Sequence, residues 1–228
     1  MLIPRYYFSD EYTDFYDCFL LQPHRKRNIL KGEYLWNSCD FINSVYYIES
    51  GICMTSVIHE DGHQKILYFH SKGSITPGFH QTQFKIEQSI ITQAISDMRV
   101  LEFSRETIYS LFLNHPQFSA LAFENYAKLI NIFIYETAHQ EYNHSFVKLC
   151  NLLYLFTKNS PNKNPSRIDL SQENIADILT LNRVNVARSL SRLRKEGIIL
   201  SHRKWIEVIN HQKLEHYCSQ ETLDSNEK

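Results

Sequence analysis

The pattern of residues 171–208 limits the possible folds of this chain more than any other feature. Ser171-x-x-Asn174 resembles a helix start, and the apolar face that follows is interrupted at Thr180-Leu181-Asn182. Asn182 is a good N-cap for a second helix, which Gly197 would end. The apolar stripe of this second helix consists of Val186, Leu190 and Leu193. Two short helices joined by a tight turn are therefore predicted.

A β-ribbon should follow these helices. The apolar runs 198–200 and 205–208 flank a basic turn, Ser201-His202-Arg203-Lys204. A helix-turn-helix with a wing is the simplest assembly of these parts.

Positive charge is concentrated on the second helix, although the whole chain has a net charge of −1. Between Asn182 and Gly197 there are five positive side chains and one negative, a net charge of +4. Arg183 and Arg188 are separated by about 140° around a helix, so they flank one face. Such a helix fits the DNA major groove, where arginine can pair with guanine. A solvated basic face without a partner is the alternative interpretation.

The first 105 residues or so have the pattern of a strand-rich domain. Short β-branched and aromatic runs such as 44–51 and 51–58 are separated by turn signals. Asp61-Gly62, between apolar segments, predicts a tight hairpin. We expect a small barrel or sandwich.

A long helix is expected from about Pro116 to Asn143, since apolar residues recur there at helical spacing. Phe123, Ile130 and Ile134 make it apolar on more than one face, so it needs two partners: the barrel and a second copy of itself. A further helix should cover 146–157. The predicted class is α+β, with domains at residues 1–115, 116–145 (the dimerisation helix) and 146–228.

The order of these parts resembles the CRP/FNR family of bacterial transcription regulators. The segment Val45–Gly51 followed by Asp61-Gly62 and Gly73 is similar to the family's β-roll, and the helix after residues 104–108 to its dimerisation helix. Residues 171–199 are similar to its helix-turn-helix. The resemblance implies a cytoplasmic homodimer that binds double-stranded DNA, with a cyclic-nucleotide-binding-like β-roll that senses a small-molecule effector.

Two departures from the family restrict the cofactor and effector. Family members that bind cyclic nucleotides hold the phosphate with an arginine, whereas residues 73–88 contain none, so cyclic AMP is not expected. The oxygen-sensing branch needs clustered cysteines near the N-terminus. The cysteines here, Cys18, Cys39, Cys53, Cys150 and Cys218, form no such cluster, and we expect no iron–sulfur cluster. A haem sensor using His70 or His80 is a weaker alternative.

The resemblance also places the effector site. The segment that binds ligand in the family corresponds here to Tyr68, Phe79, His80, Phe84 and Gln88. Their aromatic and amide groups suit a small organic molecule, including an aromatic one, as in the halophenol-responsive branch. The bland alternative is that Phe79 and Phe84 belong to the core and that His80 faces solvent.

At the DNA-reading position the family commonly has Arg-Glu-x-x-x-Arg, and this chain has Arg183, Val184 and Arg188. Valine cannot accept a hydrogen bond from cytosine but can contact a thymine methyl, so an A·T-rich half-site is expected. The halophenol-responsive branch shares this substitution. Asn182, Asn185 and Lys204 should contact the DNA backbone.

The loop Lys158–Ser166 matches the family's polymerase-contacting loop, which allows activation, although repression by occlusion is equally compatible. His59 and His63 flank a hairpin turn, so no metal site is expected there. No catalytic motif and no membrane segment is found in the sequence. The rival functions are a small-molecule-binding dimer whose winged helix contacts proteins, and a haem or redox sensor.

Overall fold

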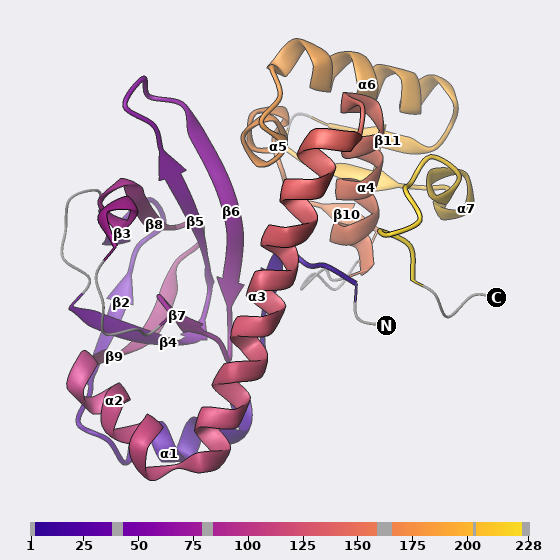
Figure 1. Cartoon of the computed structure of the whole chain (residues 1–228). Coiled ribbons are helices and arrows are strands. Elements are labelled where there is room, and N and C mark those ends of the chain that lie inside the picture. Colours follow the sequence, from indigo (N-terminus) through magenta and orange to yellow (C-terminus); the bar gives the residue numbers. More distant parts are fainter. Residues whose placement is uncertain (1–2, 38–42, 79–83, 159–165, 203, 225–228) are drawn as a thin grey trace. The chain divides into compact units, whose positions relative to one another are not determined.

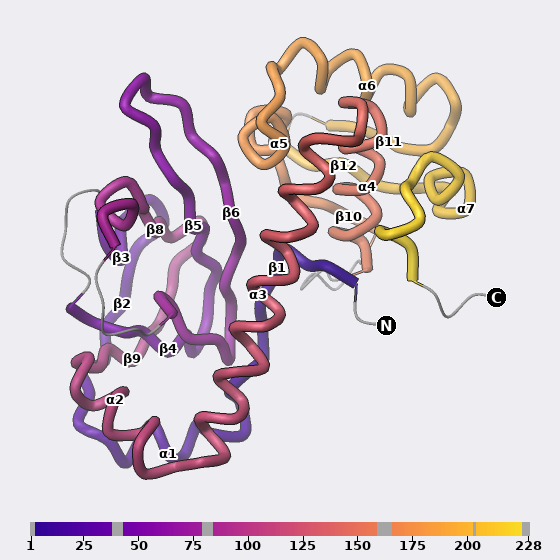
Figure 2. The backbone as a smooth tube through the Cα atoms, viewed as in Figure 1, coloured from indigo at the N-terminus to yellow at the C-terminus, as the bar shows by residue number. Residues whose placement is uncertain are grey.

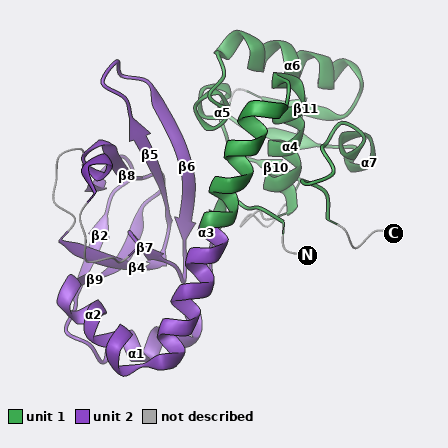
Figure 3. Cartoon of the chain, in the orientation of Figure 1, with its two compact units in different colours: residues 1–7, 130–228 green, residues 8–129 purple. Residues whose placement is uncertain are grey.

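The computed structural model describes residues 3–37, 43–78, 84–158, 166–202 and 204–224 (Figure 1; backbone path in Figure 2). It divides into two compact units, coloured separately in Figure 3: an N-terminal unit, Phe8–Leu129, and a C-terminal unit, Met1–Tyr7 with Ile130–Lys228. The division falls inside the long helix α3 (Pro116–Tyr142), whereas the sequence places boundaries near residues 115 and 145. Helix α3 therefore contributes to both units.

Two antiparallel sheets build the N-terminal unit. One has the order β1-β6-β5-β8-β3 and the other β2-β9-β4-β7. The strands are β1 (Tyr7–Phe8), β2 (Arg25–Ile29), β3 (Tyr34–Trp36), β4 (Ser44–Ser50), β5 (Ile52–Ile58), β6 (Gln64–Ser71), β7 (Ile75–Thr76), β8 (Ile90–Ala94) and β9 (Met98–Ser104). This arrangement is the β-roll that the sequence predicts.

The hairpin between β5 and β6 lies where Asp61-Gly62 predicts it. Ile58 pairs with Gln64, and the His59 backbone N–H donates to the His63 carbonyl (2.8 Å). Gly62 has a φ of +82°, which glycine adopts without the steric penalty of a side chain. The turn excludes the helical geometry that could aim His59 and His63 at one metal ion.

Strand β4 has a buried side chain on both faces. Val45 and Tyr47 belong to one hydrophobic cluster, and Tyr46 and Ile48 belong to another. Successive residues of a strand point to opposite faces, so an unbroken apolar run is the pattern expected for a strand covered on both sides. The first cluster is closed by helical elements: η1 (Thr13–Phe15), α1 (Tyr16–Leu20), α2 (Arg105–Asn114) and the beginning of α3. A further short element, η2 (Lys85–Ser89), precedes β8.

The C-terminal unit contains the second half of α3 and the predicted winged helix-turn-helix. The elements are α4 (Ser145–Lys158), β10 (Arg167–Ile168), α5 (Gln172–Leu179), α6 (Arg183–Lys195), β11 (Ile199–Ser201), β12 (Ile206–Val208) and α7 (His211–Glu215). The three strands form an antiparallel sheet of order β10-β12-β11. Helix α4 is buried from Leu149 to Thr157, so it is the central helix of this unit. The helices predicted at 116–143 and 146–157 are thus confirmed to within a residue or two.

Polar side chains tie the C-terminal segment to α3 and α4. Asn151 and Ser219 exchange two hydrogen bonds of 2.9 Å, Ser219 shares a bond with Thr222 (2.9 Å), and Thr222 shares one with the Tyr135 hydroxyl (2.7 Å). Thr222 is fully buried. This segment therefore holds the second half of α3 against α4. Among the described helices, none has the length and apolar character needed to cross a bilayer.

Candidate functional site

The turn between α5 and α6 is fixed by local hydrogen bonds. At the start of α5, Ser171 Oγ accepts from the Asn174 N–H and Asn174 Oδ1 accepts from the Ser171 N–H, both at 3.1 Å, so asparagine completes the capping box. At its end, Thr180 adopts the left-handed conformation (φ +52°), which costs a residue with a Cβ about 1–2 kcal/mol. After this change of direction the chain reaches Asn182, the N-cap of α6, two residues later.

Helix α6 has the ends that the sequence predicts. Asn182 Oδ1 accepts from the Asn185 N–H (2.8 Å), which leaves the Asn182 amide nitrogen to donate elsewhere. Gly197 has a φ of +68°, and the Ile198 N–H donates to the Leu193 carbonyl (3.0 Å), the bond of a Schellman cap.

One face of α6 is buried and the opposite face is exposed and cationic. Val186, Leu190 and Leu193 are buried, as expected. Apart from Arg192, which packs on aromatic rings, the exposed charged and apolar side chains of the helix are Arg183, Val184, Arg188, Arg194 and Lys195. At about 100° per residue they lie within a sector of about 140°. Val184 is 65% exposed, so a branched apolar side chain stands among four cations. This sector has the composition needed to contact phosphates and a thymine methyl.

Arg192 departs from this group. Its guanidinium lies over the Phe146 ring (4.0 Å to the centroid) and near the Tyr217 ring (5.1 Å), and its Nε donates to Glu196 Oε1 (2.9 Å). The Tyr217 hydroxyl donates to Glu196 Oε2 (2.8 Å). Arg192 therefore fastens α6 to its own unit. The Arg192–Glu196 ion pair has no net charge. The remaining four cations of α6, Arg183, Arg188, Arg194 and Lys195, therefore give the exposed face a net charge of +4.

Arg183 occupies the first turn of α6, where a positive charge opposes the helix dipole. The first turn contains no acidic residue to compensate it. The exposed N–H groups of a helix start favour a phosphate, and a bound phosphate would also neutralise Arg183. An electrostatic cost of this kind is expected where the residue serves binding rather than stability.

The wing presents Lys204 at its exposed tip. Beside it the His202 ring stacks on Trp205 (3.6 Å between centroids), and the Arg167 guanidinium lies 4.8 Å from the Trp205 ring centre. These contacts brace the turn between β11 and β12. Arg203, the remaining cation of this turn, lies outside the described residues.

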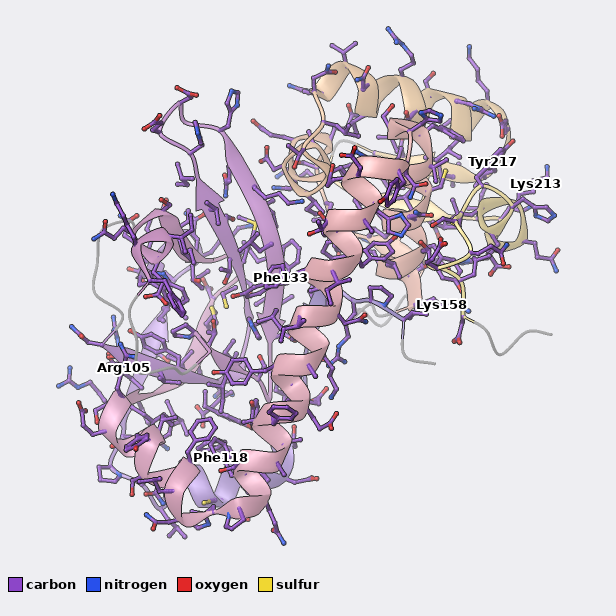
Figure 4. All side chains as sticks on the ribbon, in the orientation of Figure 1. Arg105, Phe118, Phe133, Lys158, Lys213 and Tyr217 are labelled. Carbon is purple, nitrogen blue, oxygen red and sulfur yellow. The ribbon has the colours of Figure 1, made fainter. Side chains whose placement is uncertain are left out.

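A cavity of about 50 Å³ lies inside the N-terminal unit, between the β-roll and the first half of α3. Its aromatic walls are Phe8, Tyr12, Tyr68, Phe112, Phe118 and Tyr126. The other lining residues are Glu11, His70, Ser74, Ile75, Gly78, Ile108, Asn125 and Leu129. Phe118 is labelled in Figure 4, near the start of α3. Its ring meets those of Phe112 (5.0 Å) and Tyr12 (5.6 Å), which makes this wall continuous.

The effector residues predicted from the sequence are only partly gathered here. Tyr68 lines the cavity, and His70, the alternative haem ligand, lies beside it (5.1 Å between ring centroids). Phe84 precedes η2 and Gln88 lies within it; both are exposed and neither lines the cavity. Phe79 and His80 lie outside the described residues.

The sequence reasoning missed the cavity residues that come from distant segments, notably Phe8, Tyr12, Asn125 and Tyr126. The sequence contains a signal for Asn125, because this amide stands at helical spacing among apolar residues of the helix. In the structure its side chain is 9% exposed. Burial raises the pKa of Tyr12 and of Tyr68 to about 12, so both phenols are uncharged at neutral pH.

The thiols within the described part of the chain do not form a reactive cluster. Burial raises the pKa of Cys53 and of Cys150 to about 12, which keeps both as thiols at neutral pH. Cys39 lies outside the described residues. Within residues 3–37, 43–78, 84–158, 166–202 and 204–224, no three His, Cys, Asp or Glu side chains are grouped so that they could hold a metal ion.

Family models match both units of the chain. A cyclic nucleotide-binding domain model matches residues 26–115, and a Crp-like helix-turn-helix domain model matches residues 147–217. The chain is 26% identical over 196 residues to the fumarate and nitrate reduction regulatory protein of Vibrio cholerae. It is 25% identical over 195 residues to electron transport regulator A of Shewanella oneidensis. Each match covers 83% of this chain and 77% of the relative.

Solved structures agree on the fold. FixK2 from Bradyrhizobium japonicum has a TM-score of 0.74 at 19% identity, over 86% of this chain and 98% of that one. CprK complexed with OCPA has a TM-score of 0.69 at 21% identity, over 89% and 92%. The solved structures show the fold alone, whereas the two family models and the curated relatives show that the chain belongs to the CRP/FNR family of DNA-binding transcription regulators.

Proposed function

We propose that the chain is a cytoplasmic homodimeric regulator that binds a palindromic, A·T-rich DNA site under the control of a small organic effector, and that it catalyses no reaction. The exposed face of α6 carries this proposal. It combines four cations with an exposed valine on a helix fixed at both ends, which suits contact with base edges and phosphates.

Within this proposal, each residue of the interface has its own role. Arg183 and Arg188 contact guanine or phosphate, and Val184 contacts a thymine methyl. Asn182, Asn185 and Lys204 contact the DNA backbone. The amide nitrogen of Asn182 remains free of the capping bond, which supports its assignment.

The second copy would bind along α3. Phe123, Ala127, Ile130, Ile134 and Thr137 recur at alternating spacings of four and three, and all five are exposed. This is the spacing of a coiled-coil seam, in which two helices bury one apolar stripe. Ile134 is 65% exposed and Phe123 is 74% exposed, which favours a partner for this face. The paired α6 helices would then enter successive major grooves, about 34 Å apart.

Effector gating follows from the two roles of α3. The same helix lines the cavity with Asn125, Tyr126 and Leu129 and carries the proposed dimer seam. An effector that binds better to one arrangement of the paired helices would shift the dimer toward that arrangement. The halophenol-responsive branch is the model for this, and the aromatic walls of the cavity support an aromatic effector.

When the protein activates transcription, the loop Lys158–Ser166 would contact the RNA polymerase α-subunit; residues 159–165 lie outside the described part of the chain. Deletion of this loop should abolish promoter activation and preserve DNA binding. Unchanged activation would exclude the contact.

Binding selection from random-sequence DNA tests the proposed function. The full chain should recover a palindrome with A·T-rich half-sites, and its affinity should fall steeply as salt rises from 50 to 200 mM. A protein-binding winged helix would recover no sequence and show no such dependence. A coloured purified protein would favour the haem-sensing alternative instead.

A further inference from the structure

We propose that residues 3–7, which precede the β-roll in the sequence, position the helix-turn-helix of the C-terminal unit, and that Tyr6 is the positioning residue. Tyr6 acts through a relay of hydrogen bonds that passes Glu136 and Gln140 and ends at the Leu179 carbonyl. The inference rests on the proposed function, since it takes α6 as the helix that contacts DNA. It goes beyond that function by giving a segment outside the helix-turn-helix a role in DNA binding.

Residues 3–7 belong to the C-terminal unit and have its colour in Figure 3. Pro4 and Tyr6 are buried while their neighbours are partly exposed, the alternation of an extended segment with one covered face. The Tyr6 ring stacks on Phe156 of α4 (5.5 Å between centroids), and the Tyr7 ring meets Phe156 edge-on (5.4 Å). These two ring contacts hold the segment on α4.

The hydroxyl of Tyr6 donates to α3. Its acceptor is Glu136 Oε1, and the Tyr6 side chain is only 3% exposed. Burial, and after it the nearby Glu136 carboxylate, raise the pKa of this phenol well above its usual value, so the hydroxyl keeps its proton and remains a donor. A hydrogen bond to a carboxylate is stronger than one between neutral groups. The segment therefore fixes the position of the Glu136 carboxylate.

Gln140, one turn further along α3, extends this constraint to α5. Its Nε2 donates to Glu136 Oε2 (3.4 Å) and to the Leu179 carbonyl (3.2 Å). Lys148 Nζ donates to Gln140 Oε1 (2.9 Å), so the amide oxygen faces the lysine and the amide nitrogen faces the two acceptors. The relay thus joins residues 3–7 to the last residue of α5.

Leu179 lies at the turn that sets the direction of α6. Carbonyl groups in the last turn of a helix have no partner within it, and Gln140 satisfies this one. The next residue, Thr180, has a φ of +52°, and the Leu181 N–H donates to the Ala176 carbonyl (3.0 Å). A left-handed residue with a Cβ persists only where its surroundings fix it. Without the Gln140 bond the turn would open more often, and the exposed face of α6 would lose its fixed orientation.

DNA affinity of the full-length protein tests the relay. Tyr6→Phe keeps the ring on Phe156 and removes only the hydroxyl, and Gln140→Met removes the amide. Each variant, shown to be folded by circular dichroism, should bind the selected palindrome about fivefold or more weakly in fluorescence anisotropy. Because both changes break the same relay, the double variant should bind about as weakly as the weaker-binding single variant.

Tyr7→Phe is the matched control. It removes a hydroxyl from the neighbouring ring, which also contacts Phe156 but is outside the relay. This variant should bind the palindrome as wild type does.

Amide hydrogen exchange separates positioning from general packing. In Tyr6→Phe and in Gln140→Met, exchange of the Leu181 N–H should accelerate at least about fivefold more than exchange of the Leu152 N–H, which lies in the buried part of α4. A residue that only packs would accelerate both amides equally. The proposal is overturned by that result, by full additivity of the two affinity losses, or by an equal loss in Tyr7→Phe.

Exchange is measured without DNA, so the relay and the proposed function can fail separately. Wild-type protein that selects no palindrome refutes the proposed function, and the faster exchange at Leu181 would still uphold the relay. Wild-type protein that selects a palindrome, together with a Tyr6→Phe variant that binds it equally well, refutes the positioning role alone.

Discussion

Replacing Arg183 with alanine should change stability and DNA binding in opposite directions. In the free protein Arg183 lies in the first turn of α6, with no acidic residue beside it. Its removal relieves an unfavourable interaction with the helix dipole, which is about 0.3–1 kcal/mol at low ionic strength. On DNA the same side chain contacts a base or phosphate, and its loss should cost about 1–3 kcal/mol per half-site. Because the dimer carries two copies, affinity for the palindrome should fall by about 2–6 kcal/mol, at least about 30-fold.

Urea unfolding at a fixed protein concentration measures the first effect, and fluorescence anisotropy with the selected palindrome measures the second. Arg188→Ala is the matched control, because Arg188 is also exposed but lies beyond the first turn. It should weaken DNA binding by a similar amount without raising stability. If Arg183→Ala is less stable than wild type and binds DNA equally well, Arg183 has a structural role and our reasoning about α6 is wrong.

Three further predictions test the dimer, the C-terminal segment and the pH response. Ile134→Lys places a charge in the proposed seam and should give monomers in sedimentation velocity. Glu124→Lys, whose side chain lies about 100° around α3 from the seam residue Phe123, should remain dimeric. Equal dissociation of the two variants would exclude the seam. Thr222→Val removes the hydrogen bonds from Thr222 to the buried Tyr135 hydroxyl (2.7 Å) and to Ser219 (2.9 Å) and should lower the free energy of unfolding by about 1–3 kcal/mol in urea, and an unchanged midpoint would mean that the segment does not fasten α3. Burial lowers the pKa of His139 below 6.5, so the unfolded chain binds more protons and stability should fall as the pH drops from 7 to 5; His139→Gln should flatten this fall, and an identical pH profile would refute the assignment.

Much of the fold follows from local sequence signals, because local chemistry determines those elements. Asn182 and Gly197 end α6 through bonds to residues within five positions, so their roles can be read without tertiary information. The hairpin at Asp61-Gly62 depends on a similarly local property, the left-handed conformation of glycine. Short-range capping and turn geometry were therefore predicted correctly.

The role of Arg192 could not be predicted in this way. The sequence places it with the other cations of α6, whereas it contacts Phe146 and Tyr217, which lie 46 and 25 positions away. Only the packing of α4 and the C-terminal segment brings those rings together. Charge counting along one helix cannot distinguish a cation without an aromatic contact from an exposed cation whose guanidinium packs on aromatic rings.

The cavity illustrates the same limit. Its walls come from Phe8 and Tyr12, from β6, from α2 and from α3, and no local pattern joins these segments. Reasoning from the family's ligand-binding segment gathered Tyr68 but also chose Phe84 and Gln88, which are exposed at η2. A ligand site formed by several elements is determined by the tertiary fold.

If the exposed face of α6 reads bases, Val184→Glu should change the DNA sequence that the protein selects. A glutamate at this exposed position can accept a hydrogen bond from cytosine N4, which valine cannot. Binding selection with the variant should return a C·G pair at one position of each half-site where the wild type returns an A·T pair, with the other positions unchanged. Recovery of the same half-site by both proteins would show that α6 does not contact base edges at Val184.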